Sequence, residues 1–255
     1  MWCSSYTDGN HVSGVVSIMT GAMRIGSLFS GIGGLELGLE RAGVGRTVWQ
    51  VEKDPYCRQV LARHWPDAVR YDDVTTVDWS TVQPVEVLCG GFPCTDISPA
   101  GRRAGIEGEQ SGLWAHFAAA VRDLRPRYVV VENSTSLLVR GMGRVVGDLA
   151  AVGYDAEWEC VPAAAVGAPH LRARLFVLAY PCGNRDETDD ALQAGWELPE
   201  LHPGWMPEPP ICRVVDGPPY PLGNADELRA LGNAVVPQVA EVVGRRLLDL
   251  ERGAA

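Results

Sequence analysis

The sequence predicts an α/β fold in which helices cover both faces of a parallel sheet, and three observations support this prediction. The chain has 255 residues with 46% apolar content, which is enough to bury one α/β core and a modest appendage. Short apolar runs alternate with segments of helical periodicity from residue 24 to residue 180. The links between these segments are short, as they are in parallel α/β sheets.

The alternation begins at Arg24 and can be followed along the chain. Strands are expected at 24–29, 47–52, 85–89, 127–132, 155–161 and 174–180. Helices are expected at 34–42, 55–64, 113–123 and 141–152. A last helix begins with Pro237 in its first turn, where the missing amide proton costs nothing. One face of that helix carries Val239, Val242, Val243, Leu247 and Leu250.

Two segments fall outside the alternation. Residues 1–22 have no usable periodicity, so we interpret them as a disordered or misassigned leader. From residue 181 the composition shifts to Pro, Gly, Trp and acidic residues, which is typical of a loop-rich insertion. The predicted division is a leader at 1–22, a main domain at 23–180, a small region at 181–225, and a C-terminal helix at 226–255 that completes the main domain.

Charge is distributed unevenly along the chain. The net charge is -10, and Lys53 is the only lysine. Between residues 98 and 146, however, seven arginines face four carboxylates, whereas between 181 and 228 two arginines face ten. A small basic surface on an acidic body favours a short, local grip on a polyanion over a long electrostatic track.

Cysteine usage and hydropathy exclude several classes of protein. The seven cysteines contain no C-x-x-C pair, so they predict neither a disulfide framework nor a zinc site. No apolar run reaches the ~20 residues that span a bilayer, and the N-terminal stretch lacks the features of a signal peptide. We therefore expect a cytoplasmic protein with reduced thiols, no metal and no membrane contact.

A glycine-rich turn follows the first strand. Gly31, Gly33 and Gly34 lead into a helix, a geometry that brings bare backbone up to a ligand. Glu52, nineteen residues after Gly33, ends the next strand, where an acidic side chain can accept the two hydroxyls of a ribose. Asp73, after the following strand position, is placed to accept from an adenine amino group. A tight turn needs glycine for backbone reasons alone, but the two carboxylates favour an adenosine ligand.

A cysteine lies at the same predicted edge of the sheet. Cys94 follows the strand at 85–89, and Glu132 ends the strand at 127–132. Arg172 and Arg174 enter from a later strand. A cysteine after proline is more often an inert buried residue, yet a carboxyl and two guanidinium groups beside it indicate a reactive site.

Five segments resemble, in order, the motifs of the DNA cytosine-5 methyltransferases: FSGIGG at 29–34, GFPC at 91–94, ENS at 132–134, R-A-R at 172–174 and LGNAVVP at 231–237. The resemblance covers about 24–180 and 226–250. It is closest to the compact, stand-alone bacterial or phage type. It implies a Rossmann-like S-adenosylmethionine-dependent methyltransferase fold with a short, loop-rich target-recognition region at 181–225.

The resemblance also implies a role for each candidate residue. Cys94 would attack C6 of a cytosine flipped out of double-stranded DNA, Glu132 would hold and protonate N3, and Arg174 with Arg172 would hold O2. Contacts to the cofactor S-adenosyl-L-methionine are implied for Phe29, Gly31, Gly33, Gly34, Glu52, Asp73, Val74, Pro93 and Asn233. DNA contacts are implied for Ser98, Arg102 and Arg103, which lie in a glycine-rich segment expected to close over the DNA.

Three positions depart from the family pattern: Thr95, Ser134 and His170. Only about 45 residues separate the last core strand from the closing motif, so little chain is left for reading a target sequence. A tRNA-directed branch with the same apparatus is the alternative activity. A silent DNA-binding module is a further alternative, which the presence of Cys94, Glu132 and both arginines disfavours. We expect a monomer, with a cognate restriction endonuclease as a conceivable partner.

Overall fold

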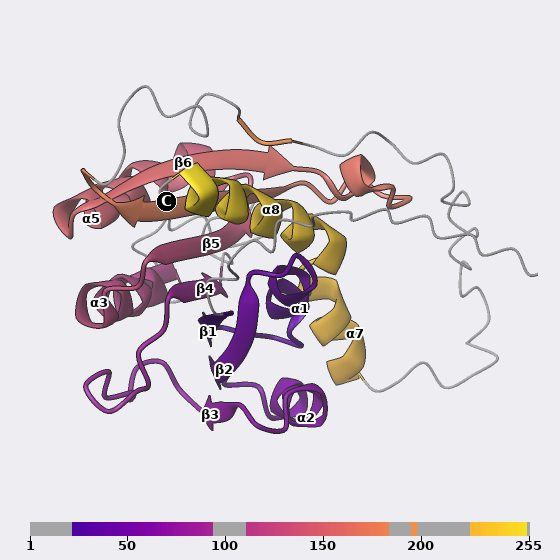
Figure 1. Ribbon diagram of the computed structural model, residues 1–255. Helices are drawn as coiled ribbons and strands as arrows, with labels where there is room; N and C mark the ends of the chain where they lie inside the picture. Colours follow the sequence, from indigo (N-terminus) through magenta and orange to yellow (C-terminus); the bar gives the residue numbers. More distant parts are fainter. Residues whose placement is uncertain (1–21, 94–110, 184–194, 198–224, 254–255) are drawn as a thin grey trace, which may run out of the picture.

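A seven-stranded sheet forms the centre of the computed structural model, which describes residues 22–93, 111–183, 195–197 and 225–253 (Figure 1). Within these residues the strand order is β3-β2-β1-β4-β5-β7-β6. The strands are β1 (Met23–Leu28), β2 (Gly45–Val51), β3 (Val69–Tyr71), β4 (Val87–Gly91), β5 (Tyr128–Ser134), β6 (Tyr154–Val161) and β7 (Arg174–Pro181).

The expectation of a wholly parallel sheet is wrong for one strand. β1 to β5 pair in parallel, but β7 lies antiparallel between β5 and β6. The chain from β6 to β7 contains only a 3-10 turn, η3 (Ala163–Val166), in place of a crossover helix, and such a connection suits an antiparallel pair. The reversal puts Arg174, the first residue of β7, opposite Ser134, the last residue of β5. An arginine that begins a strand therefore reaches the edge where the parallel strands end.

Helices cover both faces of the sheet (Figure 1). The described helices are α1 (Gly34–Arg41), α2 (Pro55–His64), η2 (Ser111–Leu113), α3 (Trp114–Leu124), α4 (Leu137–Arg140), α5 (Met142–Ala151), α7 (Ala225–Asn233) and α8 (Pro237–Gly253). None of them is long and apolar enough to cross a membrane.

Alternation along the central strands builds two apolar layers. In β5, Val129 and Val131 pack with α3 and α5, whereas Tyr128 and Val130 pack on the opposite side with α1 and α8. Successive side chains of a strand point to opposite faces, so a run such as YVVV is buried on both. The structure confirms this run as a central strand of the sheet.

The closing helix returns to the sheet as predicted. Val239, Val242, Val243, Leu247 and Leu250 are all buried, which confirms the expected apolar face of α8. Arg246, only 2% exposed, forms two 2.7 Å hydrogen bonds with Glu157 of β6. No strand was predicted at β3, and the segment 226–255, predicted as a C-terminal helix, contains two helices. β3 has only three residues, and α7 is separated from α8 by the short turn after Asn233.

Candidate active site

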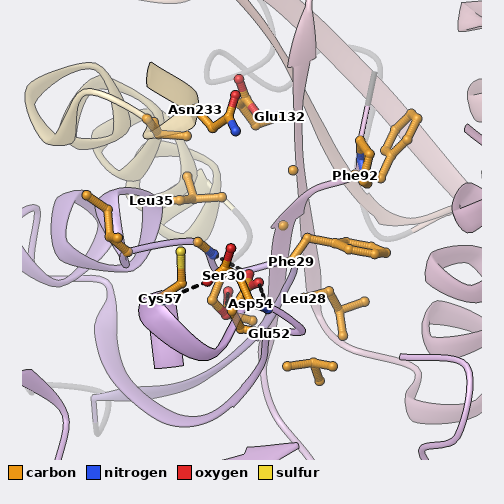
Figure 2. Close-up of a pocket in the computed structure, with 18 of the residues that line it drawn as sticks. Leu28, Phe29, Ser30, Leu35, Glu52, Asp54, Cys57, Phe92, Glu132 and Asn233 are labelled. Carbon is orange, nitrogen blue, oxygen red and sulfur yellow. Dashed lines mark hydrogen bonds between the residues drawn. The ribbon is translucent and has the colours of Figure 1, made fainter. Parts of the chain in front are cut away.

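A pocket of about 460 Å³ lies at the carboxyl edge of β1, β2, β4 and β5 (Figure 2). This is the edge at which open α/β sheets bind ligands. The strand registers bring it about, because Leu28 pairs with Val51 and with Gly90, and Gly91 pairs with Glu132. Of the predicted residues, the lining includes Phe29, Gly31, Gly34, Glu52, Asp73, Val74, Pro93, Glu132, Arg174 and Asn233.

The predicted cofactor turn is held by Glu52. The amide of Gly31 donates to one carboxylate oxygen of Glu52 and the amide of Asp54 donates to the other, both at 2.7 Å. Phe29 and Gly31 have φ values of 54° and 55°, so the turn leaves β1 in a left-handed conformation. Glu52 thus fixes the turn while it also lines the pocket.

Asp73 and Val74 line the same end of the pocket. One oxygen of Asp73 accepts from the amide and hydroxyl of Thr75 at 3.0 and 2.8 Å, and the other lies 3.0 Å from Lys53 Nζ. The hydrogen bond from the backbone amide of Thr75 and the interaction with Lys53 lower the pKa of Asp73 to about 2. The side chain is therefore an ionised acceptor at neutral pH.

Gly33 is the predicted cofactor residue that does not line the pocket. It is the N-cap of α1 with φ 88°, and a Cβ placed there would lie 2.3 Å from the indole of Trp65. Its role is to let α1 and the Trp65 ring approach each other. Gly34, in contrast, lines the pocket beside Val235.

Glu132 lies at the opposite end of the pocket, at the tip of β5 (Figure 2). It is 9% exposed, and one of its oxygens lies where a side chain at Gly91 would be, since a Cβ there would meet it at 2.4 Å. Neighbouring Asn133 donates from Nδ2 to the carbonyl of Phe92 at 3.0 Å. The glycine of the GFPC motif thus makes room for Glu132, and Asn133 ties the end of β4 to the end of β5.

Arg174 pairs with Glu132, with 3.0 Å between Nε and Oε1. Burial raises the pKa of Glu132 to about 7, although the charges of Arg174 and Arg172 oppose this rise. A carboxyl with such a pKa exchanges its proton near neutral pH, which suits a general acid or base.

Arg172 has a different set of contacts from Arg174. Its Nη2 atom donates to the carbonyl of Gly232 at 2.7 Å and to that of Ala234 at 2.8 Å. It is not among the residues that line the pocket. The two predicted arginines therefore come to the same edge of the sheet with different partners.

The remaining predicted residues lie outside the described part of the chain. These are the nucleophile Cys94 and the DNA-contact residues Ser98, Arg102 and Arg103. Pro93, one residue before Cys94, lines the pocket.

Sequence reasoning missed several residues of the pocket. Asp54 caps α2 by accepting from the amides of Tyr56 and Cys57, and it pairs with Arg229 of α7 at 2.7 Å. An Asp before a Pro at a helix start is a signal that predicts such a cap. Glu36 of α1 also lines the pocket and is fully buried. The only sequence signal of its burial is its position in the helical period, three residues before the apolar Leu39.

Comparisons with known proteins agree on one family. The model of the family described as C-5 cytosine-specific DNA methylase matches residues 23–200. The type II methyltransferase M.CviJI of Paramecium bursaria Chlorella virus IL3A is 31% identical over 82% of this chain and 55% of its own. The type II methyltransferase M.NgoBI of Neisseria gonorrhoeae is 30% identical over 88% of this chain and 80% of its own. The chain spans about half the length of the first curated relatives that it matches.

Solved structures show the same fold at lower identity. A DNA modification methyltransferase encoded within an E. coli prophage superposes with a TM-score of 0.54 at 24% identity, over 66% of this chain and 50% of that one. The Dnmt2 methyltransferase of S. pombe superposes with a TM-score of 0.55 at 18% identity, over 67% and 55%.

Proposed function

The chain belongs to the C-5 cytosine-specific DNA methylase family, and on this premise we propose that it transfers a methyl group from S-adenosyl-L-methionine to carbon 5 of cytosine in double-stranded DNA. The observation that carries the proposal is a single pocket with two chemically different ends. Glu52 and Asp73 line one end, and Glu132 and Arg174 line the other.

The end lined by Glu52 and Asp73 suits the adenosine part of the cofactor. Carboxylates at the ends of consecutive strands accept hydrogen bonds from ribose hydroxyls and from an amino group. Gly31 leaves open space in the turn beside them, since a Cβ there would meet nothing within 4 Å. Val74 and Pro93 complete the wall with apolar surface. S-adenosylmethionine, when bound here, supplies the electrophilic methyl group.

Cys94 provides the nucleophile in this proposal. Its thiolate adds to C6 of the cytosine, and the ring electrons pass to C5, which is otherwise a poor nucleophile. After C5 has been methylated, the C5 proton is removed and the thiolate is eliminated, so the aromatic ring is restored. The position of Pro93 in the pocket wall supports this assignment for the next residue.

Glu132 and Arg174 stabilise the charges that develop on the base. A protonated Glu132 donates to N3 and passes its proton there as C6 is attacked, and the pKa of about 7 leaves that proton available at neutral pH. Arg174, paired with Glu132 at 3.0 Å, is placed to hold O2 and to offset negative charge. The base must be flipped out of the helix to meet these groups, at a cost of about a few kcal/mol.

Recognition of DNA is assigned to two further segments. Ser98, Arg102 and Arg103 contact phosphates from the glycine-rich segment after Cys94. The region 181–225, whose only basic residues are Arg185 and Arg213, reads the target. Each good bidentate contact to a base contributes about 1–3 kcal/mol of discrimination. So small and acidic a region predicts a target of about two to four base pairs.

The setting of the reaction follows from the same proposal. We place it in the cytoplasm of a bacterial or phage-infected cell, with the enzyme acting as a monomer. A cognate restriction endonuclease is the partner to look for.

Radiolabelled S-adenosylmethionine tests the activity directly. The protein should label double-stranded DNA and leave tRNA unlabelled, and the Cys94→Ser variant is the matched control. Bisulfite sequencing of the DNA should then locate the methyl group at cytosine C5 within a short target. Labelling of tRNA alone would transfer the proposal to the tRNA-directed branch, and labelling of neither by a folded preparation would overturn it.

A further inference from the structure

Arg172 makes contacts that differ from those expected of a residue that holds the base. Its Nη2 donates to the carbonyls of Gly232 and Ala234 at 2.7 and 2.8 Å. These carbonyls flank Asn233, the last residue of α7. One charged donor is thus shared by two carbonyls that lie sixty residues further along the chain. These two hydrogen bonds fix the turn after α7.

The turn held by Arg172 is a wall of the pocket. Asn233, Ala234 and Val235 all line it, together with Arg229 and Ala230 of α7. Figure 2 shows Asn233 near Glu132, whereas Val235 of the same turn lies against Gly34 of the glycine loop, so the turn connects the two ends of the pocket. Any displacement of the turn therefore changes the shape of the ligand space.

The other side of the turn rests on the glycine loop. A Cβ placed on Gly34 would lie 2.2 Å from the carbonyl oxygen of Val235, so only glycine allows this approach. The turn is thus held between Gly34, at the start of α1, and the guanidinium of Arg172. Cofactor loop, turn and arginine form one continuous chain of contacts.

The backbone around Arg172 is itself fixed. The amide of Ala163 donates to the carbonyl of Leu171 at 2.8 Å, and Arg174 pairs with both Ser134 and Val161 in the sheet. Arg172 has a φ of 25°, a left-handed value that persists in a residue other than glycine only where the surroundings enforce it. Burial lowers the pKa of Arg172 and the charge of Arg174 lowers it further, while Glu132 raises it. The hydrogen bonds to the carbonyls of Gly232 and Ala234 offset the cost of burying the Arg172 cation beside that of Arg174.

We propose that Arg172 is a positioning residue that holds the 232–235 turn against the glycine loop and so shapes the cofactor wall, while Arg174 acts on the base. The ligand in this inference rests on the proposed function, because that function names S-adenosylmethionine as the occupant. The clamp itself rests only on the contacts of Arg172, Gly34 and the turn.

Arg174 is the matched control, because it lies two residues away and its charge is the same. A residue that only holds the flipped base has no effect on the cofactor when DNA is absent. Arg174→Met should therefore abolish turnover but leave the affinity for S-adenosylhomocysteine within twofold. Arg172→Met should weaken that affinity about tenfold without DNA, the scale of a lost charged hydrogen bond transmitted through one turn.

Calorimetry with S-adenosylhomocysteine and no DNA makes the comparison, and hydrogen exchange of peptides covering 230–236 adds a readout that needs no ligand. Exchange of these amides should be faster in Arg172→Met than in wild type or Arg174→Met. Arg172→Lys, which keeps the charge and a single donor nitrogen in place of the guanidinium fork, should restore part of both losses. Arg172→Lys also serves as the test variant if the methionine variant does not fold.

Equal cofactor affinity and equal exchange in wild type and in the Arg172 variants would overturn the inference. If the wild type fails to bind S-adenosylhomocysteine, the proposed cofactor is wrong, and the exchange experiment alone then decides whether the clamp exists.

Discussion

Glu52 directly follows β2, Glu132 lies near the end of β5, and both line the pocket, but their surroundings differ. Both oxygens of Glu52 are engaged by backbone amides, those of Gly31 and Asp54. Glu132 is buried against Gly91, has Arg174 as its ion-pair partner, and has a pKa raised to about 7. In the proposed function, Glu52 is a fixed acceptor and Glu132 carries a proton.

This difference teaches that backbone amides stabilise one end of the pocket, whereas an ion pair between side chains forms the other. The cofactor end is made of backbone turns whose polar groups are satisfied before any ligand arrives, so changes there should alter binding. The catalytic end concentrates charge in a buried place, so changes there should alter the rate of the chemical step. The following predictions test this division and the buried carboxyl of Glu36 beside it, from the largest expected effect to the smallest.

Replacing Cys94 with Ser should reduce methyl transfer below detection, because serine lacks a thiolate that can add to C6. The affinity for S-adenosylhomocysteine should stay within twofold of wild type, since the thiol acts on the base. Single-turnover transfer and calorimetry measure the two effects. Substantial turnover by this variant would contradict a covalent mechanism through Cys94.

Glu132→Gln should lower kcat by about 10²- to 10⁴-fold, the usual contribution of a positioned general acid or base, with little change in cofactor affinity. The wild-type pKa is raised, so the protonated form is lost as the pH rises through about 7. The wild-type profile of kcat against pH should therefore have an alkaline decline near this value that the variant lacks. An unchanged profile in the variant would contradict the role of Glu132.

Glu36→Gln tests a buried carboxyl that the proposed chemistry does not use. Burial raises the pKa of Glu36 to about 7, and the hydroxyls of Ser27 and Ser30 oppose this only in part, because neither carboxyl oxygen has a well-formed hydrogen bond among the described residues. Ionising this group in the folded protein is unfavourable. Its contribution to stability is therefore intact below pH 4.5 and is lost as the pH rises through 7.

The variant lacks this loss, so its advantage in free energy of unfolding over wild type should grow between pH 4.5 and 7, to about 3 kcal/mol at most. Urea unfolding at pH 5 and pH 8 measures the difference. An advantage that is the same at both pH values would show that Glu36 does not titrate in this range.

Glu52→Ala should weaken binding of S-adenosylhomocysteine by about 1–3 kcal/mol, the scale of losing charged hydrogen bonds at a partly buried site. Part of the loss arises because Gly31 and Asp54 lose the acceptor that fixes the turn. Glu52→Gln, which keeps one acceptor oxygen, should lose less. Calorimetry that finds all three proteins equal would remove Glu52 from the cofactor site.

Arg229→Met should have the smallest effect. The pair with Asp54 spans 2.7 Å, but the arginine side chain is 57% exposed, and exposed pairs contribute less than about 1 kcal/mol. Cofactor affinity should fall by less than about fivefold, and high salt should erase the difference. A larger, salt-independent loss would mean that Arg229 contacts the cofactor itself.

Much of the fold could be predicted from the sequence, because the unbroken apolar run YVVV is typical of a strand buried on both faces and the apolar residues of α8 recur with helical periodicity. The antiparallel β7 could not, since a strand carries no mark of its direction and only the η3 connection reveals it. At the site, glycines and strand-end carboxylates located the pocket. The different contacts of Arg172 and Arg174 could not be predicted from the sequence, because they depend on which acceptors lie within reach, and for Arg172 these acceptors are sixty residues away.

The most direct test of the central claim, cytosine C5 methylation through Cys94, uses DNA that carries 5-fluorocytosine. Fluorine at C5 blocks the elimination that frees the enzyme, so wild type with S-adenosylmethionine should form a denaturation-resistant protein–DNA adduct, and peptide mapping should place the attachment at Cys94. Cys94→Ser should form none. An active wild-type preparation that forms no adduct, or an adduct attached at another residue, would contradict the account.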